Sequence, residues 1–187
     1  CKETGALLIF DEVQTGFGRT GKLFAHQHYN VRPDIITLAK GMGGGMPIGA
    51  LVTSKKLMDH FKENPILGHI TTFGGHPVSC AASLACLNVI LDEKLTSGIA
   101  KKEKLFRKLL VHPQIKEVRG KGLMLAVQLD TFENVQIVIA HCLNNGVISD
   151  WFLFCDNAIR LSPPLNIAEE DIRFACKVLL EGIDLLE

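Results

Sequence analysis

The sequence predicts an α/β fold, and three observations support that prediction. Two short, continuous apolar runs, at residues 6–10 and 35–39, are typical of strands buried on both faces of a parallel sheet. Residues 78–95 are rich in Ala, Leu and Cys, as expected of a closely packed helix. Near the end of the chain, apolar residues recur at helical spacing from Ile172 to Leu186. Strand and helix patterns therefore both occur along the chain.

Further elements follow in order through the first part. A third strand is expected at residues 48–53. Pro77 is well placed as the first residue of the following helix, because its fixed φ suits that position and no N–H is needed there. From Gly98 to Val111 an amphipathic helix is expected, with apolar side chains on one side and five basic ones largely on the other. We interpret the basic run as a solvated face, not a binding patch.

The second part of the chain is typical of a smaller α/β unit. Residues 123–129 alternate between two sets of side chains in a strand pattern. A helix is expected from about residue 133 to 145, ending at Gly146. Short strands are expected around Val147 and Ile159.

The last helix has a recognisable start, because Asn166 and Glu169 make a plausible capping arrangement.

The chain is expected to divide near residue 98. We therefore predict two domains, at residues 1–98 and 99–187.

Composition and charge disfavour several classes of function. The formal net charge is zero and the pI is about 7.2, so no overall field favours nucleic acid or an anionic membrane. The six cysteines form no Cys-x-x-Cys pair, which favours reduced thiols in a cytoplasmic protein. No apolar stretch reaches membrane-spanning length. The hydrophobic fraction of 47% and the mean hydropathy of +0.22 are high, and they predict surface that packs against another segment or subunit.

The residues that carry chemistry follow the first two strands. Asp11 comes directly after residues 6–10, and Lys40 comes directly after residues 35–39. Because the carboxyl ends of parallel strands meet at one edge of a sheet, we expect Asp11 and Lys40 to face one ligand. An amine and a carboxylate at that edge suit pyridoxal phosphate. The lysine forms the Schiff base, and the carboxylate keeps the pyridine nitrogen protonated so that the ring can accept electrons.

A different functional class competes for the glycine-rich stretch. Gly16 to Gly21 fits the dinucleotide pattern G-x-G-x-x-G, and Gly16 to Lys22 fits most of a P-loop. A dinucleotide fingerprint should follow its strand almost at once, whereas residues 11–15 intervene. A P-loop needs a hydroxyl for magnesium, which Leu23 does not supply. Nucleotide binding by Gly16 to Gly21 is therefore the weaker alternative.

Three motifs together resemble the class III aminotransferases. Residues 11–21 (DEVQTGFGRTG), 37–41 (TLAKG) and 71–75 (TTFGG) match that family in order and approximate spacing, above all its acetylornithine, ornithine and 4-aminobutyrate aminotransferases. The resemblance runs through essentially the whole chain. It implies a fold-type I pyridoxal-phosphate-dependent transferase, with a partial large-domain sheet in residues 1–98 and the small carboxyl-terminal domain in residues 99–187. It also implies a carboxyl-terminal fragment that lacks the amino-terminal half.

The resemblance assigns roles residue by residue. Lys40 would be the Schiff-base lysine and the base that moves a proton between substrate and cofactor. Asp11 would pair with the pyridinium nitrogen. Val13 would pack on the ring face, and Gln14 would hydrogen-bond the phenolic oxygen. Thr72 resembles the threonine that reaches the cofactor phosphate of the other subunit.

Arg160 resembles the arginine with which the family binds the substrate carboxylate. A planar guanidinium grips a carboxylate through two parallel hydrogen bonds, which fix its orientation. His76 stands where many relatives have asparagine. His26 and His28 have a spacing that a metal could use on a strand, but no third ligand is evident, so no metal site is predicted.

The implied reaction is transamination. An amino group passes from an amino acid or ω-amino donor to pyridoxal 5′-phosphate and then to a keto acid such as 2-oxoglutarate, in a cytoplasmic homodimer. The residues leave the identity of the amino donor open. A second hypothesis is that the 187 residues form a catalytically silent fragment, which keeps its fold and self-association without a complete cofactor site.

Overall fold

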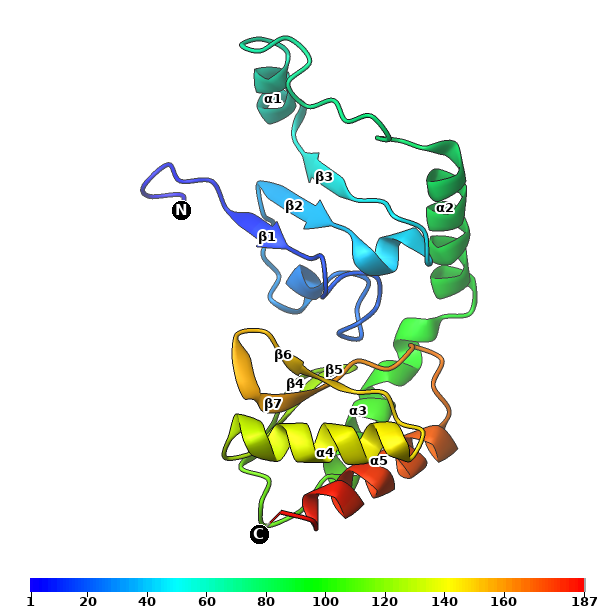
Figure 1. Cartoon of the computed structure of the whole chain (residues 1–187). Helices are drawn as coiled ribbons and strands as arrows, with labels where there is room; N and C mark the ends of the chain where they lie inside the picture. The colour runs from blue at the N-terminus through cyan, green and yellow to red at the C-terminus, as the bar shows by residue number, and fades with distance from the viewer. Residues whose placement is uncertain (187) are drawn as a thin grey trace. The chain divides into compact units, whose positions relative to one another are not determined.

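Two separate sheets, each with its own helices, make up the structure (Figure 1). The computed structural model describes residues 1–186, and the chain forms two compact units, Cys1–Thr96 (unit 1) and Ser97–Glu187 (unit 2). Strands and helices occur in both units, which confirms the predicted mixed α/β class. Within residues 1–186, no helix combines the length and apolar character needed to cross a bilayer.

Unit 1 is built on a three-stranded sheet with the order β1-β2-β3. The strand β1 (Ile9–Asp11) is parallel to β2 (Ile35–Leu38), as the two apolar runs predict. The expected extent of β1 over residues 6–10 and its burial on both faces are wrong, because β1 begins only at Ile9 and Ile9 is 56% exposed. The third strand, β3 (Ala50–Thr53), is antiparallel to β2 and starts slightly later than the sequence predicts. Because β1 and β2 are parallel, their carboxyl ends lie at one edge of the sheet.

One long helix and several short helical turns complete unit 1. The helix α2 (Pro77–Asp92) begins with proline in its first turn, as the sequence predicts. It packs against η2 (Lys40–Gly43), the short helix that follows β2, and Figure 1 shows the green α2 beside this light-blue turn. The other short helices are η1 (Ala25–His28), α1 (Lys55–Met58) and η3 (Asp59–Phe61). A further short helix, η4 (Leu95–Gly98), spans the boundary between the two units.

Unit 2 contains a four-stranded antiparallel sheet with the order β4-β5-β7-β6. The strand β5 (Met124–Gln128) lies inside the predicted alternating run, and alternate residues of that run are buried in the core. Because side chains alternate between the two faces of a strand, this pattern puts one face of β5 against the helices. The other strands are β4 (Glu117–Lys121), β6 (Asp150–Phe152) and β7 (Cys155–Leu161).

Three helices enclose the core of unit 2. They are α3 (Ile99–Leu109), α4 (Phe132–Asn144) and α5 (Glu169–Ile183). The helix α4 packs on β7, and α5 packs on both α3 and α4. The hydroxyl of Thr131 accepts a hydrogen bond from the N–H of Asn134 at 3.2 Å, which caps the start of α4.

The expected strand around Val147 is wrong, because that residue completes the cap of α4. The N–H of Val147 donates to the carbonyl of Cys142 at 2.8 Å, and the N–H of Gly146 donates to Leu143 at 3.3 Å. Gly146 has a φ of +80°, so the three residues form a Schellman motif. The next strand begins only at Asp150.

The expected capping by Asn166 and Glu169 is also wrong. The helix α5 begins at Glu169 after Ala168, and no side chain caps it. Asn166 lies too early to reach the first amides of the helix. The carboxylate of Glu169 instead pairs with the ammonium of Lys101 at 2.5 Å.

Candidate active site

Asp11 and Lys40 lie at the carboxyl ends of neighbouring parallel strands, as the sequence predicts. Asp11 is the last residue of β1 and pairs in register with Thr37 of β2. The N–H of the next residue, Glu12, donates to the carbonyl of Thr37 at 3.0 Å. Lys40 begins η2 just past the end of β2, and both Asp11 and Lys40 are exposed. The edge of the sheet therefore presents a carboxylate and an amine from two adjacent strands.

A tight turn after β1 holds Asp11, Val13 and Gln14. One carboxylate oxygen of Asp11 accepts a hydrogen bond from the N–H of Val13 at 2.9 Å. The N–H of Gly16 donates to the carbonyl of Glu12 at 3.0 Å. A Cβ on Gly16 would lie 2.9 Å from that same oxygen, so only glycine fits there. Val13 is half-buried in this turn, whereas Gln14 is exposed.

Glu12 is a buried residue of this motif that sequence reasoning missed. Its side chain is 2% exposed, and its carboxylate accepts hydrogen bonds from Thr15, Ala25 and His26. Burial alone would raise the pKa of Glu12, but these hydrogen bonds outweigh that effect and hold the pKa below its ordinary value. An acidic residue between two predicted site residues was the only signal in the sequence, and such residues usually face solvent.

The turn that carries Lys40 lies tightly against α2. Lys40 has a φ of +49° and Gly44 has a φ of +57°, both in the left-handed region. A Cβ on Gly44 would lie 2.9 Å from Cβ of Cys86 and 3.1 Å from the carbonyl oxygen of Ala82. The thiol of Cys86 donates to the carbonyl of Gly41 at 3.4 Å. The helix α2 therefore fixes the path of the chain around Lys40.

The glycine-rich stretch forms a loop closed on itself. The N–H of Gly18 donates to the carbonyl of Leu23 at 3.1 Å, and the N–H of Gly21 donates to Gly18 at 2.9 Å. These amides are used inside the loop and are not directed at a phosphate. The loop continues into η1, a short 3-10 helix, whereas a nucleotide fingerprint opens a full α-helix. The geometry therefore does not favour nucleotide binding by Gly16 to Gly21.

His26 and His28 lie on the 3-10 helix η1, and not on the strand that their spacing suggested. Nδ1 of His26 lies 3.1 Å from Oε1 of Glu12, and Nε2 of His28 lies 3.0 Å from the carbonyl oxygen of Thr20. Both rings are thus engaged in hydrogen bonds inside unit 1. Among residues 1–186, no three or more His, Cys, Asp or Glu side chains are grouped as metal ligands would be.

Thr72 lies in an exposed turn ahead of α2. Within the part of the chain that the structure describes, no hydrogen bond links Thr72 to Asp11 or Lys40. His76, the other residue singled out in this motif, immediately precedes α2 and is exposed.

Arg160 lies in unit 2, on the strand β7. It is opposite Asp150 of β6, and its Nη2 donates to Oδ2 of Asp150 at 3.1 Å. The other oxygen of Asp150 accepts from the N–H of Trp151 at 2.8 Å. Arg160 and Asp150 both line a cavity of about 690 Å³, together with Phe174. A guanidinium that faces a cavity can bind an anionic group there.

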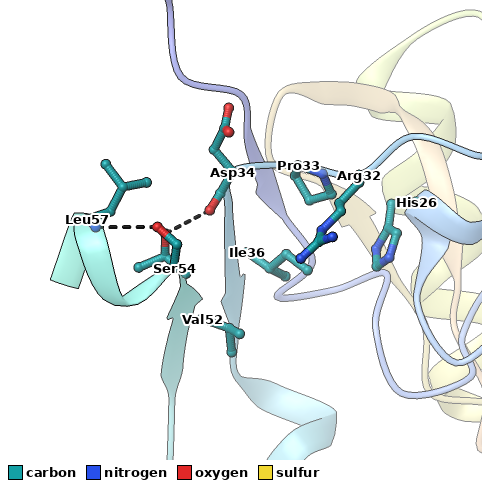
Figure 2. Close-up of a pocket in the computed structure, with 9 residues that line it drawn as sticks. His26, Arg32, Pro33, Asp34, Ile36, Val52, Ser54 and Leu57 are labelled. Atoms are coloured by element: carbon teal, nitrogen blue, oxygen red, sulfur yellow. Dashed lines mark hydrogen bonds between the residues drawn. The ribbon is translucent and has the colours of Figure 1, made fainter.

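A second cavity, of about 500 Å³, lies in unit 1 near the opposite end of β2 (Figure 2). Asp34 and Ile36 line it at the start of β2, and Leu57 lines it from α1. Figure 2 shows the guanidinium of Arg32 and the ring of His26 at the same end of this cavity. Since Lys40 follows the other end of β2, this cavity is not part of the Asp11 and Lys40 arrangement.

The residues at the strand ends fit pyridoxal phosphate chemically. Among residues 1–186, the side-chain nitrogen of Lys40 has no hydrogen-bond or ion-pair partner, so its neutral amine form is available to attack a carbonyl carbon. Asp11 uses Oδ1 on the N–H of Val13, while Oδ2 has no partner within the same residues. An available amine and an available carboxylate oxygen at adjacent strand ends are the groups that this cofactor needs from its protein.

Comparison with known proteins agrees with this chemistry. The family model described as aminotransferase class-III matches residues 1–183. The chain is 44% identical over 184 residues to the acetylornithine aminotransferase of Caldanaerobacter subterraneus subsp. tengcongensis, covering 96% of this chain and 45% of that enzyme. The chain therefore spans less than half the length of this curated relative.

Solved structures give the same result. An aminotransferase from Bacillus anthracis superposes with a TM-score of 0.91 at 34% identity, covering 100% of this chain and 46% of that one. The ornithine aminotransferase of Toxoplasma gondii superposes with a TM-score of 0.88 at 36% identity, covering 98% and 44%. That second structure was described as having partial occupancy of PLP at its active site.

Proposed function

Because the chain belongs to the class III aminotransferases, we propose that it supplies the lysine-bearing part of a transaminase active site. The reaction would move an amino group from an amino acid or ω-amino donor to a keto acid such as 2-oxoglutarate. The family's cofactor is pyridoxal 5′-phosphate, which supplies a reactive carbonyl and an electron-accepting ring when it is bound. The observation that supports the proposal most strongly is the placement of Asp11 and Lys40 at adjacent ends of parallel strands.

The residues of unit 1 take the roles that bind and orient the cofactor. The amine of Lys40 would hold the cofactor, and it would also serve as the base that moves a proton to and from the reacting carbon of the substrate. The open carboxylate oxygen of Asp11 would pair with the ring nitrogen and keep it protonated. Val13 would cover the ring, and Gln14 would donate a hydrogen bond to the phenolic oxygen.

The remaining roles extend beyond unit 1. Thr72 would bind the cofactor phosphate of a second copy, so the enzyme would act as a homodimer. Arg160 binds a substrate carboxylate from the small domain. In this assignment residues 1–98 are the carboxyl-terminal part of the large, cofactor-binding domain, and residues 99–187 are the small domain. The substrates are a small amino donor and a keto acid, and the enzyme acts in the cytoplasm.

Covalent capture of the cofactor tests the proposal. The chain is incubated with pyridoxal phosphate and reduced with borohydride, and the modified lysines are located by peptide mapping. We expect the label on Lys40 and its loss in Lys40→Ala, because among residues 1–186 no other amine follows a parallel strand beside an available carboxylate. Lys55→Ala is the matched control, since Lys55 is also an exposed lysine of unit 1. Label that is spread equally over exposed lysines would contradict the role of Lys40.

A further inference from the structure

Glu12 is the one buried charged residue in the motif that carries the proposed cofactor contacts. It lies between Asp11 and Val13, and its side chain is 2% exposed. A buried carboxylate is costly unless charge-assisted hydrogen bonds compensate for the loss of water. None of the proposed steps uses this group, so its burial requires another explanation.

Four donors surround the carboxylate of Glu12 and use both of its oxygens. Oε2 accepts from the hydroxyl of Thr15 at 2.7 Å and from the N–H of Ala25 at 2.8 Å. Oε1 accepts from the N–H of His26 at 2.8 Å, and Nδ1 of His26 lies 3.1 Å from the same oxygen. Because this oxygen is an acceptor, the hydrogen bond places a proton on Nδ1 of His26.

These donors come from both ends of one loop. Thr15 is at the beginning of the loop that follows β1, whereas Ala25 and His26 are the first two residues of η1 beyond it. The carboxylate therefore closes the loop onto the end of β1. The ring of His26 is held further by stacking on Phe24, with centroids 5.8 Å apart and an interplanar angle of 12°.

The same loop reaches the turn that carries Lys40. A Cβ on Gly41 would lie 3.7 Å from Cβ of Phe17, and a Cβ on Gly16 would lie 3.6 Å from Cδ2 of Leu38. Movement of the loop would therefore disturb contacts at the end of β2 as well as at the end of β1. Phe17 is itself buried and packs edge-on against Phe24, with centroids 5.7 Å apart.

We propose that Glu12 is a positioning residue, which fixes the backbone at residues 12–13 so that Asp11 keeps one oxygen on the N–H of Val13 and the other available to a ligand. The backbone of Glu12 is held by Thr37 of β2 and by Gly16, and its side chain is held by the far end of the loop. The direction of the Asp11 carboxylate then depends on a charge that never touches the ligand. The ligand role of Asp11 rests on the proposed function, whereas the link from Glu12 to Val13 does not.

Solvent exchange of single backbone amides, followed by NMR on the 187-residue chain, tests this link. Glu12→Gln replaces the carboxylate with an amide, whose NH₂ group is a donor and cannot accept the hydrogen bonds that a carboxylate oxygen accepts. Because glutamine keeps one accepting oxygen, we expect whichever of the Ala25 and His26 amides loses its acceptor to exchange at least tenfold faster. If Glu12 positions the site, the amide of Val13 exchanges faster by a similar factor, although that amide donates to Asp11 and not to the Glu12 carboxylate. An unchanged exchange rate at the Val13 amide overturns the proposal. The carboxylate would then stabilise only the loop and would not fix the backbone at Val13.

Two further variants keep the test decisive. Glu63→Gln removes an exposed glutamate of unit 1 and should change none of these amides. Thr15→Val removes one donor but keeps the charge, so it serves if Glu12→Gln does not fold. We expect a smaller acceleration at Val13 in Thr15→Val, and a faster Ala25 amide with an unchanged Val13 amide would again overturn the proposal. Failure of the transaminase proposal would appear separately, as missing label on Lys40 in the unaltered chain.

Discussion

The two units are of similar length, but they bury apolar side chains very differently. The core cluster of fully buried residues lies entirely in unit 2, where Leu125, Ile159 and Ile172 are completely inaccessible. In unit 1 the buried apolar side chains are Phe17, Leu38 and Ile90. Most of the large exposed apolar side chains also lie in unit 1. Unit 2 therefore has the interior of an independent domain, and unit 1 does not.

The well-packed core and the proposed cofactor-binding residues lie in different units. Unit 1 carries Asp11, Lys40 and the buried carboxylate of Glu12, which are held by hydrogen bonds, glycine contacts and one helix. On the sheet of unit 1, side chains such as Ile9 and Val52 are about half exposed, at 56% and 50%. Apolar surface of this extent favours packing against another segment or subunit, as the composition predicts.

The largest expected effect comes from separating the units. Residues 97–187 alone should unfold cooperatively, because their core does not depend on unit 1. Residues 1–96 alone should show no cooperative transition, since three buried apolar side chains cannot offset the entropy of ordering that length of chain. Urea titration followed by circular dichroism measures both. A cooperative transition in residues 1–96 would remove the distinction between the units.

Truncation of one isoleucine in each unit sharpens the comparison. Ile159→Ala in β7 should lower the free energy of unfolding of unit 2 by about 2–5 kcal/mol, because the side chain is fully buried. Ile9→Ala in β1 should cost less than about 1 kcal/mol, because Ile9 is 56% exposed. The single tryptophan, Trp151, lies in β6 and reports on unit 2 by fluorescence. Equal losses in the two variants would contradict the comparison.

A smaller effect is expected where unit 1 depends on one close contact. Gly44→Ala places a methyl group 2.9 Å from Cβ of Cys86 at a φ of +57°, so η2 must move away from α2. We expect a loss of about 1–3 kcal/mol and weaker capture of pyridoxal phosphate by Lys40. Gly45→Ala is the control, because its φ is +99° but no atom lies near its Cβ. If both variants lose the same free energy of unfolding, the loss in Gly44→Ala comes from backbone strain and not from the close contact between Gly44 and α2.

The sequence was informative where a pattern is local. Continuous apolar runs predict β1 and β2, and parallel pairing then places Asp11 and Lys40 at one edge. The start of α2 at Pro77 follows from the chemistry of proline alone. Each of these predictions depends on residues that are neighbours in the chain or on a general rule of sheet topology.

Features that depend on distant partners were missed. The carboxylate of Glu12 is buried by donors from η1, more than ten positions along the chain. The strand β4 is rich in charged residues and lies at a sheet edge, so it has no apolar pattern to reveal it. Val147 belongs to an apolar run, but the cap of α4 uses its N–H. Sequence periodicity records burial, and in these cases hydrogen bonds decide the conformation.

The smallest expected effect is a loss of folding stability at low pH, and this loss should also differ between the two units. The folded-state pKa of Glu12 is lowered, so its contribution to stability is complete above the ordinary glutamate pKa of 4.5 and is lost as the pH falls through the lower folded value. Lys101 lowers the pKa of Glu169 in unit 2 as well, but that pair is exposed and salt screens it.

We therefore expect unit 1 to lose stability as the pH falls below about 4.5, in a way that 0.5 M salt does not remove. Urea titrations of the 187-residue chain across that range, with far-UV circular dichroism for the whole chain and Trp151 fluorescence for unit 2, measure the two losses. Glu12→Gln should flatten the dependence of unit 1 on pH, because the amide does not titrate. A loss that appears first in Trp151 fluorescence would place the acid-sensitive carboxylate in unit 2 and contradict the assignment to Glu12.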